Sequence, residues 1–278
     1  MRTNTGQVLY IPRIGKRADL QHPLMKGCVG WWPLNDGAGT KAKDLTGTAD
    51  LTSTSPNWGE SSIGTVGVFP GSSTASFVAS SYVPVSGTGE LSVSAWFKTT
   101  SGGVGSIVTW GTASAGQAFE LNVEGGVIWS RNFSGNTASG GSGFNDGEWH
   151  VVTLTKPGNG TTSDMKMFVD GKQLSVTAGG STTLSFGTSS PLEIGDRGYS
   201  SSKSFDGEIQ NVRAYNRVLS ATEILELYTN PWSGLSMPSE TRYFFFSSPS
   251  PTINPFSRII TSSTILNKSG KTVIRRGA

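Results

Sequence analysis

The chain has 278 residues, of which 37 are glycine, and only 15% of its residues are charged. This composition is typical of an all-β protein with many turns, and it argues against a helical protein and against disorder driven by charge repulsion. The single cysteine, Cys28, excludes a disulfide framework within the chain. We expect no membrane insertion, because no apolar run approaches the ~20 residues that a spanning helix needs. The first residues also lack the apolar core of a signal peptide.

The charges divide the chain into three parts. Residues 1–26 carry five basic residues and one acidic residue, residues 233–278 carry six and one, and the remainder is acidic in balance. The serine- and proline-rich stretch after the Tyr243–Phe246 aromatic run is typical of a linker or an extended arm. We therefore expect a basic N-terminal arm at 1–23, a folded domain at 24–232 and a basic C-terminal arm at 233–278.

Short strands fill the predicted domain. In Leu91–Lys98 apolar and polar residues alternate, which is the period of a strand with two different faces. Asp170-Gly171 predicts a tight hairpin turn between two further strands. Other β-branched and aromatic runs are separated by glycine-rich turns; they are 107–110, 119–123, 127–129, 149–156, 192–195 and 205–215. The spacing predicts an all-β, two-sheet antiparallel sandwich.

One short helix is predicted near the end of this domain. Ser220 and Glu223 have the spacing of a capping box, in which each side chain bonds the backbone of the other residue. Ile224 and Leu227 then form an apolar stripe, and Pro231 ends the helix. So short a helix must dock on the sandwich to persist.

Several blocks resemble, in family order, the laminin-G-like, concanavalin-A-like lectin/glucanase superfamily in its bacterial and phage form. These blocks are Leu24–Thr40, Asp44–Gly47, Leu91–Lys98, Gly147–His150, Val169–Lys172, Phe205–Ile209 and Val212–Ser220. The resemblance covers about residues 24–232 and implies a jelly roll. Gln210-Asn211 departs from the pattern, because the family commonly has an acidic residue there.

The resemblance alone does not fix a function, because the superfamily includes adhesins, glycan-binding modules, glucanases and structural modules. We expect binding rather than catalysis. Leu225–Trp232 also resembles versions found beside virion parts of tailed phages, so we expect a phage virion structural or decoration protein at the virion surface. Its arms would contact other virion proteins, it would form a homo-oligomer, and its lectin-like module would contact a host glycan. The arms lack the dense basic clustering of nucleic-acid binding, which is not expected.

Two alternatives remain open at this stage, a stand-alone carbohydrate-binding module and a degenerate β-glucanase. The second depends on Glu120, Asn122 and Glu124, which would share one face of a strand. Retaining glycosidases need two neighbouring carboxyl groups, but the middle position of the glucanase signature is normally Asp and is Asn122 here. We expect these residues to form a solvated strand face instead.

Exposed aromatic side chains are the candidates for glycan binding. Trp110, Trp129, Phe133 and Tyr199 lie at predicted strand ends or in loops, where binding residues are often displayed. Packing in the core or in hairpins is the alternative for each of them. The remaining tryptophans of the predicted strands are expected in the interior or its immediate cover; they are Trp31, Trp32, Trp96 and Trp149.

Calcium is the one ion that the resemblance suggests. Some relatives hold a structural calcium ion with loop oxygens, and Asp36, Asp44 and Asp206 are the matching donors here. The alternative is that the Asp-Gly pairs at 36–37 and 206–207 are simply turns.

Overall fold

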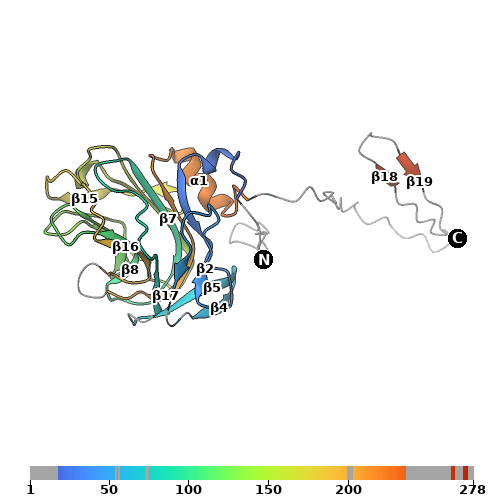
Figure 1. Ribbon diagram of the computed structural model, residues 1–278, viewed down its shortest axis with the longest axis horizontal. Coiled ribbons are helices and arrows are strands. Elements are labelled where there is room, and N and C mark those ends of the chain that lie inside the picture. The colour runs from blue at the N-terminus through green and yellow to red at the C-terminus, as the bar shows by residue number, and fades with distance from the viewer. Residues whose placement is uncertain are drawn as a thin grey trace. The chain divides into compact units, whose positions relative to one another are not determined.

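The computed structural model describes residues 18–235, except 54, 56, 73, 74 and 199–202, together with short strands at 264–266 and 272–274. Residues 18–235 form two antiparallel sheets that pack face to face, with one α-helix near the end (Figure 1). This arrangement confirms the predicted all-β jelly-roll sandwich. No helix in the described part of the chain is long and apolar enough to cross a membrane.

The first sheet has eight strands and is organised around the longest one, β17. One edge of β17 pairs with β7, and its other edge pairs with β5 in its first half and with β1 in its second half. In spatial order the strands are β14 (Lys172–Gln173), β13 (Lys166–Val169), β12 (His150–Lys156), β7 (Leu91–Lys98), β17 (Asp206–Tyr215), β5 (Gly64–Pro70) and β4 (Trp58–Ser61), with β1 (Cys28–Trp32) beside β17. The β13–β14 turn contains Asp170 and Gly171, both with positive φ, as the sequence predicts.

The second sheet has nine strands and forms the other layer. In spatial order these are β15 (Val176–Gly179), β11 (Thr137–Gly140), β10 (Val127–Arg131), β9 (Ala118–Glu124), β8 (Gly105–Gly111), β16 (Ser190–Ile194), β6 (Phe77–Val78), β3 (Leu51–Thr52) and β2 (Lys41–Ala42). Two short 3-10 helices, η1 (Pro23–Met25) and η3 (Thr162–Asp164), lie outside the sheets.

The core lies between the sheets and follows the alternation of the strands. Every second residue of β7, from Leu91 to Phe97, is fully buried in it, and so are Phe119 and Leu121 of β9. Burial of each of the larger side chains among them, Leu, Val and Phe, contributes about 1.5–3 kcal/mol. The four tryptophans expected in the interior or its cover are confirmed there: Trp31, Trp32 and Trp96 are buried, and Trp149 is half-buried.

Beside a bulge in β17, a buried network holds the segment that follows the α-helix. At Asn211 the pairing with β7 shifts register and φ is 53°. The buried guanidinium of Arg213 lies 3.7 Å from the ring of Trp31 and donates to the carbonyl oxygens of Pro231 and Ser233, at 2.6 and 3.0 Å. Asn211 belongs to the same buried network, because it accepts from the Trp31 indole and donates to the Pro231 carbonyl, both at 2.6 Å. Gln210, the other residue of the departure from the family pattern, instead donates to the Thr65 carbonyl of β5 at 2.7 Å.

Helix α1 (Ala221–Thr229) covers the eight-stranded sheet on its outward side. Its capping box is present as predicted, since Ser220 accepts from the backbone N–H of Glu223 and Glu223 accepts from that of Ser220. Ile224 and Leu227 pack against Phe168 and Tyr215 of the sheet. The helix is thus held by tertiary contacts, as its short length requires.

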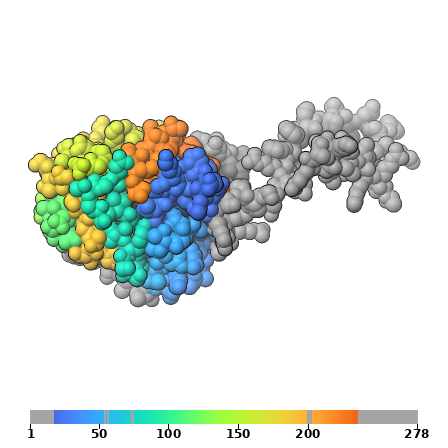
Figure 2. All heavy atoms as spheres, turned by 45° about the horizontal axis from the view of Figure 1, so that its top comes forward, coloured from blue at the N-terminus to red at the C-terminus, as the bar shows by residue number. Residues whose placement is uncertain are grey.

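The two ends of the described body meet. Ala18 and Leu235 form an antiparallel β-bridge, and the Asp19 N–H donates to the Gly234 carbonyl at 2.7 Å. In Figure 2 the first described residues, in blue, lie beside the last residues of the body, in orange. The body's contacts therefore extend a few residues beyond 24–232 at both ends. In the separate unit at 239–278, β18 (Thr264–Leu266) pairs with β19 (Thr272–Ile274).

Candidate functional site

The outward side of the nine-stranded sheet is polar. We call it the outer face, meaning the residues of this sheet that point away from the core. Because directly paired residues share a face, the register places one row of side chains across five strands: Ser106, Asn122, Trp129, Ser139 and Thr177. A parallel row holds Val78, Glu193, Thr109 and Glu120.

Trp129 and Arg131 of β10 form the aromatic centre of the outer face. The guanidinium of Arg131 lies 4.6 Å from the centre of the Trp129 ring. It also donates to Oδ1 of Asn122 at 3.0 Å and forms an ion pair with Glu124. These contacts hold the half-buried indole in one orientation, while Thr137, Ser139 and Thr177 on the next two strands keep the adjoining surface accessible.

Glu120, the candidate catalytic acid, is fully buried. Its carboxylate accepts from the Ser106 hydroxyl at 2.6 Å and from the Asn122 amide at 2.9 Å, and lies 3.4 Å from Arg197. The expectation of a solvated strand face is therefore wrong for Glu120 and Asn122. Catalysis would first require Glu120 to be uncovered, whereas Glu124 is part-exposed and paired with Arg131.

The cover comes from the connection between β16 and β17. The Thr109 hydroxyl donates to the Asp196 carbonyl at 2.9 Å, and the Ser106 N–H donates to the Lys203 carbonyl at 2.9 Å. A Cβ on Gly198 would lie 2.2 Å from Oε2 of Glu193, so this connection approaches the sheet closely. Burial raises the pKa of the Glu193 carboxyl beneath it. This half of the outer face is closed, and the half at β10, β11 and β15 is open.

The four predicted glycan-binding aromatics do not come together. Trp110 is fully buried, stacks on Phe119 with ring centroids 4.1 Å apart, and donates to the Val85 carbonyl. Neither face of its ring is accessible to a sugar. The prediction that Trp110 binds a glycan is therefore wrong. Phe133 is half-buried in the β10–β11 turn, where its φ is 65°, and Tyr199 lies outside the described residues. Trp129 is the candidate that the structure places at the surface.

The three predicted calcium ligands do not fit a metal site. Asp44 accepts from the N–H groups of Trp31, Thr46, Thr48 and Ala49 and from the Thr46 hydroxyl, at 2.7–3.0 Å. These five donors occupy the lone pairs that an ion would need, so Asp44 orders its own loop at residues 44–49 instead. Among residues 18–235, as far as they are described, no three acidic, His or Cys side chains gather as a metal site.

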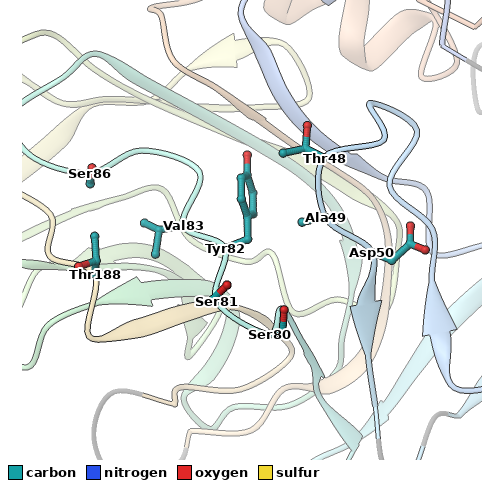
Figure 3. Close-up of a pocket in the computed structure, with 9 residues that line it drawn as sticks. All are labelled: Thr48, Ala49, Asp50, Ser80, Ser81, Tyr82, Val83, Ser86 and Thr188. Carbon is teal, nitrogen blue, oxygen red and sulfur yellow. The ribbon is translucent and has the colours of Figure 1, made fainter.

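Sequence reasoning missed a hollow at the other end of the nine-stranded sheet. It has a volume of about 620 Å³ and lies between residues 48–50, residues 80–86 and Thr188 (Figure 3). Tyr82 stands in its middle, with Thr188 and Ser86 to one side and Thr48 and Ala49 to the other. No local signal marks these positions, because serine and threonine are common in every turn of this chain.

The family is established by sequence. Residues 70–225 match the model of the family described as the concanavalin A-like lectin/glucanases superfamily. The match covers more than half of the chain, and the chain belongs to this superfamily. No curated protein sequence matches it.

Solved structures with the same fold come from toxins and glycosidases. The binding domain of Paraclostridial Mosquitocidal Protein 1 has a TM-score of 0.54 at 12% identity, over 74% of this chain and 52% of that one. Domain 4 of AbnA, a GH43 extracellular arabinanase from Geobacillus stearothermophilus in complex with arabinotriose, has a TM-score of 0.54 at 16% identity, over 72% and 98%. Trypanosoma rangeli sialidase has a TM-score of 0.53 at 17% identity, over 76% and 36%.

The chain thus spans about half of the toxin domain and about a third of the sialidase. At these identities the likeness establishes the fold alone, and fold does not fix function.

Proposed function

We propose that this chain binds a neutral glycan, without catalysis, through the open half of the outer face. The observation that carries the proposal is the arrangement around Trp129, a half-buried indole held by Arg131 and flanked by hydroxyl side chains. An indole offers a large, rigid, apolar surface with a polar N–H. The apolar face of a sugar ring can pack on such a surface while its hydroxyls bond to neighbouring groups.

The charges of the open half favour an uncharged sugar. The positive charge of Arg131 is already matched by Glu124, and Asn122 takes another of its donors. In the closed half, Glu120 is likewise paired with Arg197. An acidic sugar would therefore meet no unmatched cation on this part of the face, while a neutral sugar would face no electrostatic cost.

The superfamily membership supports this proposal without deciding it. The arabinanase domain with the same fold was solved in complex with arabinotriose, and we propose a saccharide ligand for this chain as well. Carbohydrate binding without catalysis also agrees with the closed half of the outer face, where Glu120, one of the two candidate catalytic carboxyls, is covered.

The test is a glycan array probed with the full chain and with Trp129→Ala. We expect wild type to bind a set of neutral glycans, and Trp129→Ala to lose at least tenfold in affinity for them. Trp149→Ala is the matched control, because Trp149 is also half-buried but packs beside Trp96 and Val151 of the other sheet. If Trp129→Ala binds like wild type, the proposed site is wrong.

A second proposal concerns the place where this module works. We propose that it decorates a phage virion surface, with its two basic terminal segments contacting acidic surfaces of other virion proteins and with several copies assembled together. The concentration of basic residues in 1–26 and 233–278 supports this role. Mass spectrometry of purified particles tests it, since particles that lack the chain would contradict it.

A further inference from the structure

We infer that the hollow around Tyr82 is a second binding site, for a small neutral saccharide or another polyol. It uses none of the residues of the proposed glycan site, so it goes beyond the proposed function. Its volume of about 620 Å³ lies within the ~300–1,000 Å³ typical of small-molecule sites.

The lining of the hollow sets the class of ligand. Hydroxyl side chains from three separate segments surround it, namely Thr48, Ser80, Ser81, Ser86 and Thr188. Each hydroxyl both donates and accepts hydrogen bonds, which matches the hydroxyls of a polyol. Tyr82, Val83 and Ala49 add apolar surface against which the carbon skeleton of a sugar can pack (Figure 3).

Charge argues against an ionic ligand. Among the described residues that line the hollow there is no Lys or Arg, and the one acid is Asp50. That carboxylate is already engaged, because it accepts from the Lys43 ammonium at 2.6 Å and from the Asp44 N–H at 3.1 Å. An anion would meet this carboxylate, and a cation would find it paired.

The wall at residues 48–50 is fixed before any ligand arrives. The five hydrogen bonds that Asp44 accepts include those from the N–H groups of Thr48 and Ala49. The Trp32 indole also donates to the Ala49 carbonyl at 2.8 Å. Because this segment is already ordered, binding loses little conformational entropy there.

The wall at residues 80–86 is fixed in the same way. The Tyr82 hydroxyl donates to the Val29 carbonyl, and its ring packs at 57° on Trp32, with centroids 6.2 Å apart. The Tyr82 carbonyl accepts from the Leu192 N–H at 2.8 Å. Burial raises the pKa of the Tyr82 hydroxyl well above its ordinary value. The Tyr82 side chain therefore stays uncharged and fixed in place at physiological pH.

The position of the hollow separates it from the proposed glycan site. Residues 48–50 lead into β3, and β3 lies five strand spacings from β10 in the sheet order. At ~4.8 Å a spacing, the two sites are roughly 24 Å apart along the sheet. Ligands can therefore occupy both at once, and two weak sites on one polymer would add avidity.

The experiment is a calorimetric titration of the full chain with arabinotriose, cellotriose and maltotriose, repeated on three variants. Ser81→Trp fills the hollow from an exposed position. Thr188→Trp, also at an exposed position, fills it from the side that faces Thr48 and Ala49. Ser163→Trp is the control, because Ser163 is equally exposed but lies in η3, away from the hollow.

We expect both filling variants to lose at least tenfold in affinity for one of these probes, while Ser163→Trp and Trp129→Ala keep that affinity. If Ser81→Trp and Thr188→Trp fold and bind every probe as wild type does, the hollow is not a saccharide site. In that case, loss of binding in Trp129→Ala would still support the proposed function. If both filling variants lose affinity for a probe that Trp129→Ala still binds, the result supports a saccharide site in the hollow. It does so whether or not the site at Trp129 is correct.

Discussion

The two sheets of this protein treat their outward sides differently. The outward side of the eight-stranded sheet is covered by apolar and aromatic side chains, including Trp96, which stacks on Tyr228 of α1 with ring centroids 6.5 Å apart. The outward side of the nine-stranded sheet carries ion pairs and hydroxyls around one half-buried indole, Trp129. One outward side completes the fold, and the open half of the other is the site that we propose for a ligand.

This difference gives the two surfaces separate energetic roles. Removing a side chain from the covered surface exposes apolar area or leaves a buried polar group without its hydrogen-bond partner, so it should lower stability. Removing one from the open half of the outer face should lower affinity and leave stability nearly unchanged, because surface substitutions usually cost little.

The largest expected effect is on stability, from Arg213→Ala. This change leaves the carbonyls of Pro231 and Ser233 without their donor and opens a space beside Trp31. Hydrogen bonds from charged donors and buried cavities together predict a loss of about 3 kcal/mol or more. Urea unfolding measures it. A loss below about 1 kcal/mol would mean that these contacts of Arg213 contribute little to the stability of the covered side.

The next effect is on affinity, from Arg131→Leu. Without the guanidinium, Trp129 loses its support and Glu124 loses its partner. We expect saccharide affinity to fall about tenfold, or ~1.4 kcal/mol, while stability changes by less than about 1 kcal/mol. Arg217→Leu is the control, since Arg217 is also ion-paired but sits at α1. A variant that kept its affinity would remove Arg131 from the site.

A smaller effect concerns the helix cap. Hydrogen bonds from Arg217, together with those from Ser220, hold the pKa of the Glu223 carboxyl at about 2, against an ordinary 4.5. The pKa is lower in the folded state, so the ionised Glu223 carboxylate stabilises the fold. This stabilisation is present above pH 4.5 and is lost as the pH falls towards 2. We expect Glu223→Gln to cost about 1 kcal/mol near neutral pH, with the difference from wild type closing in acid.

Denaturant unfolding at neutral pH and at about pH 3 measures this change. A difference from wild type that is the same at both pH values would assign the loss to the shape of the side chain rather than to its charge.

The smallest effect is at His150, on the rim of the eight-stranded sheet. Burial of the ring opposes its charge, but the hydrogen bonds with Asp170 at 2.9 Å and Asp146 at 3.2 Å raise the pKa of His150 above its ordinary value. The stability that the protonated His150 ring contributes is therefore fully present in mild acid and is lost as the pH rises through its pKa in the folded protein.

His150→Gln should cost about 0.5 kcal/mol more in mild acid than at alkaline pH. Thermal unfolding at both pH values checks it, and a larger cost on the alkaline side would contradict the sign.

Local rules predicted most of the fold. Alternation identified β7, the Asp-Gly pair gave the β13–β14 turn, and the capping box placed the start of α1. Each of these signals depends on neighbouring residues alone.

The candidate site was only partly predictable, because it depends on contacts between distant segments. Alternation correctly placed Glu120 and Asn122 on one side of β9, but it could not show that Asp196, Arg197 and Lys203 cover them. Trp110 looked available because strand ends often display aromatics, yet this one points into the core. The hollow requires three segments that meet only after folding.

The most direct test of the proposed separation is an NMR titration of the labelled full chain with a neutral saccharide found on the array. We expect the resonances of the Trp129 indole and of backbone amides in β9, β10 and β11 to shift, while those of α1 and of the Trp96–Tyr228 stack stay unchanged. Shifts centred on α1, or an unperturbed Trp129 at saturating saccharide, would contradict it.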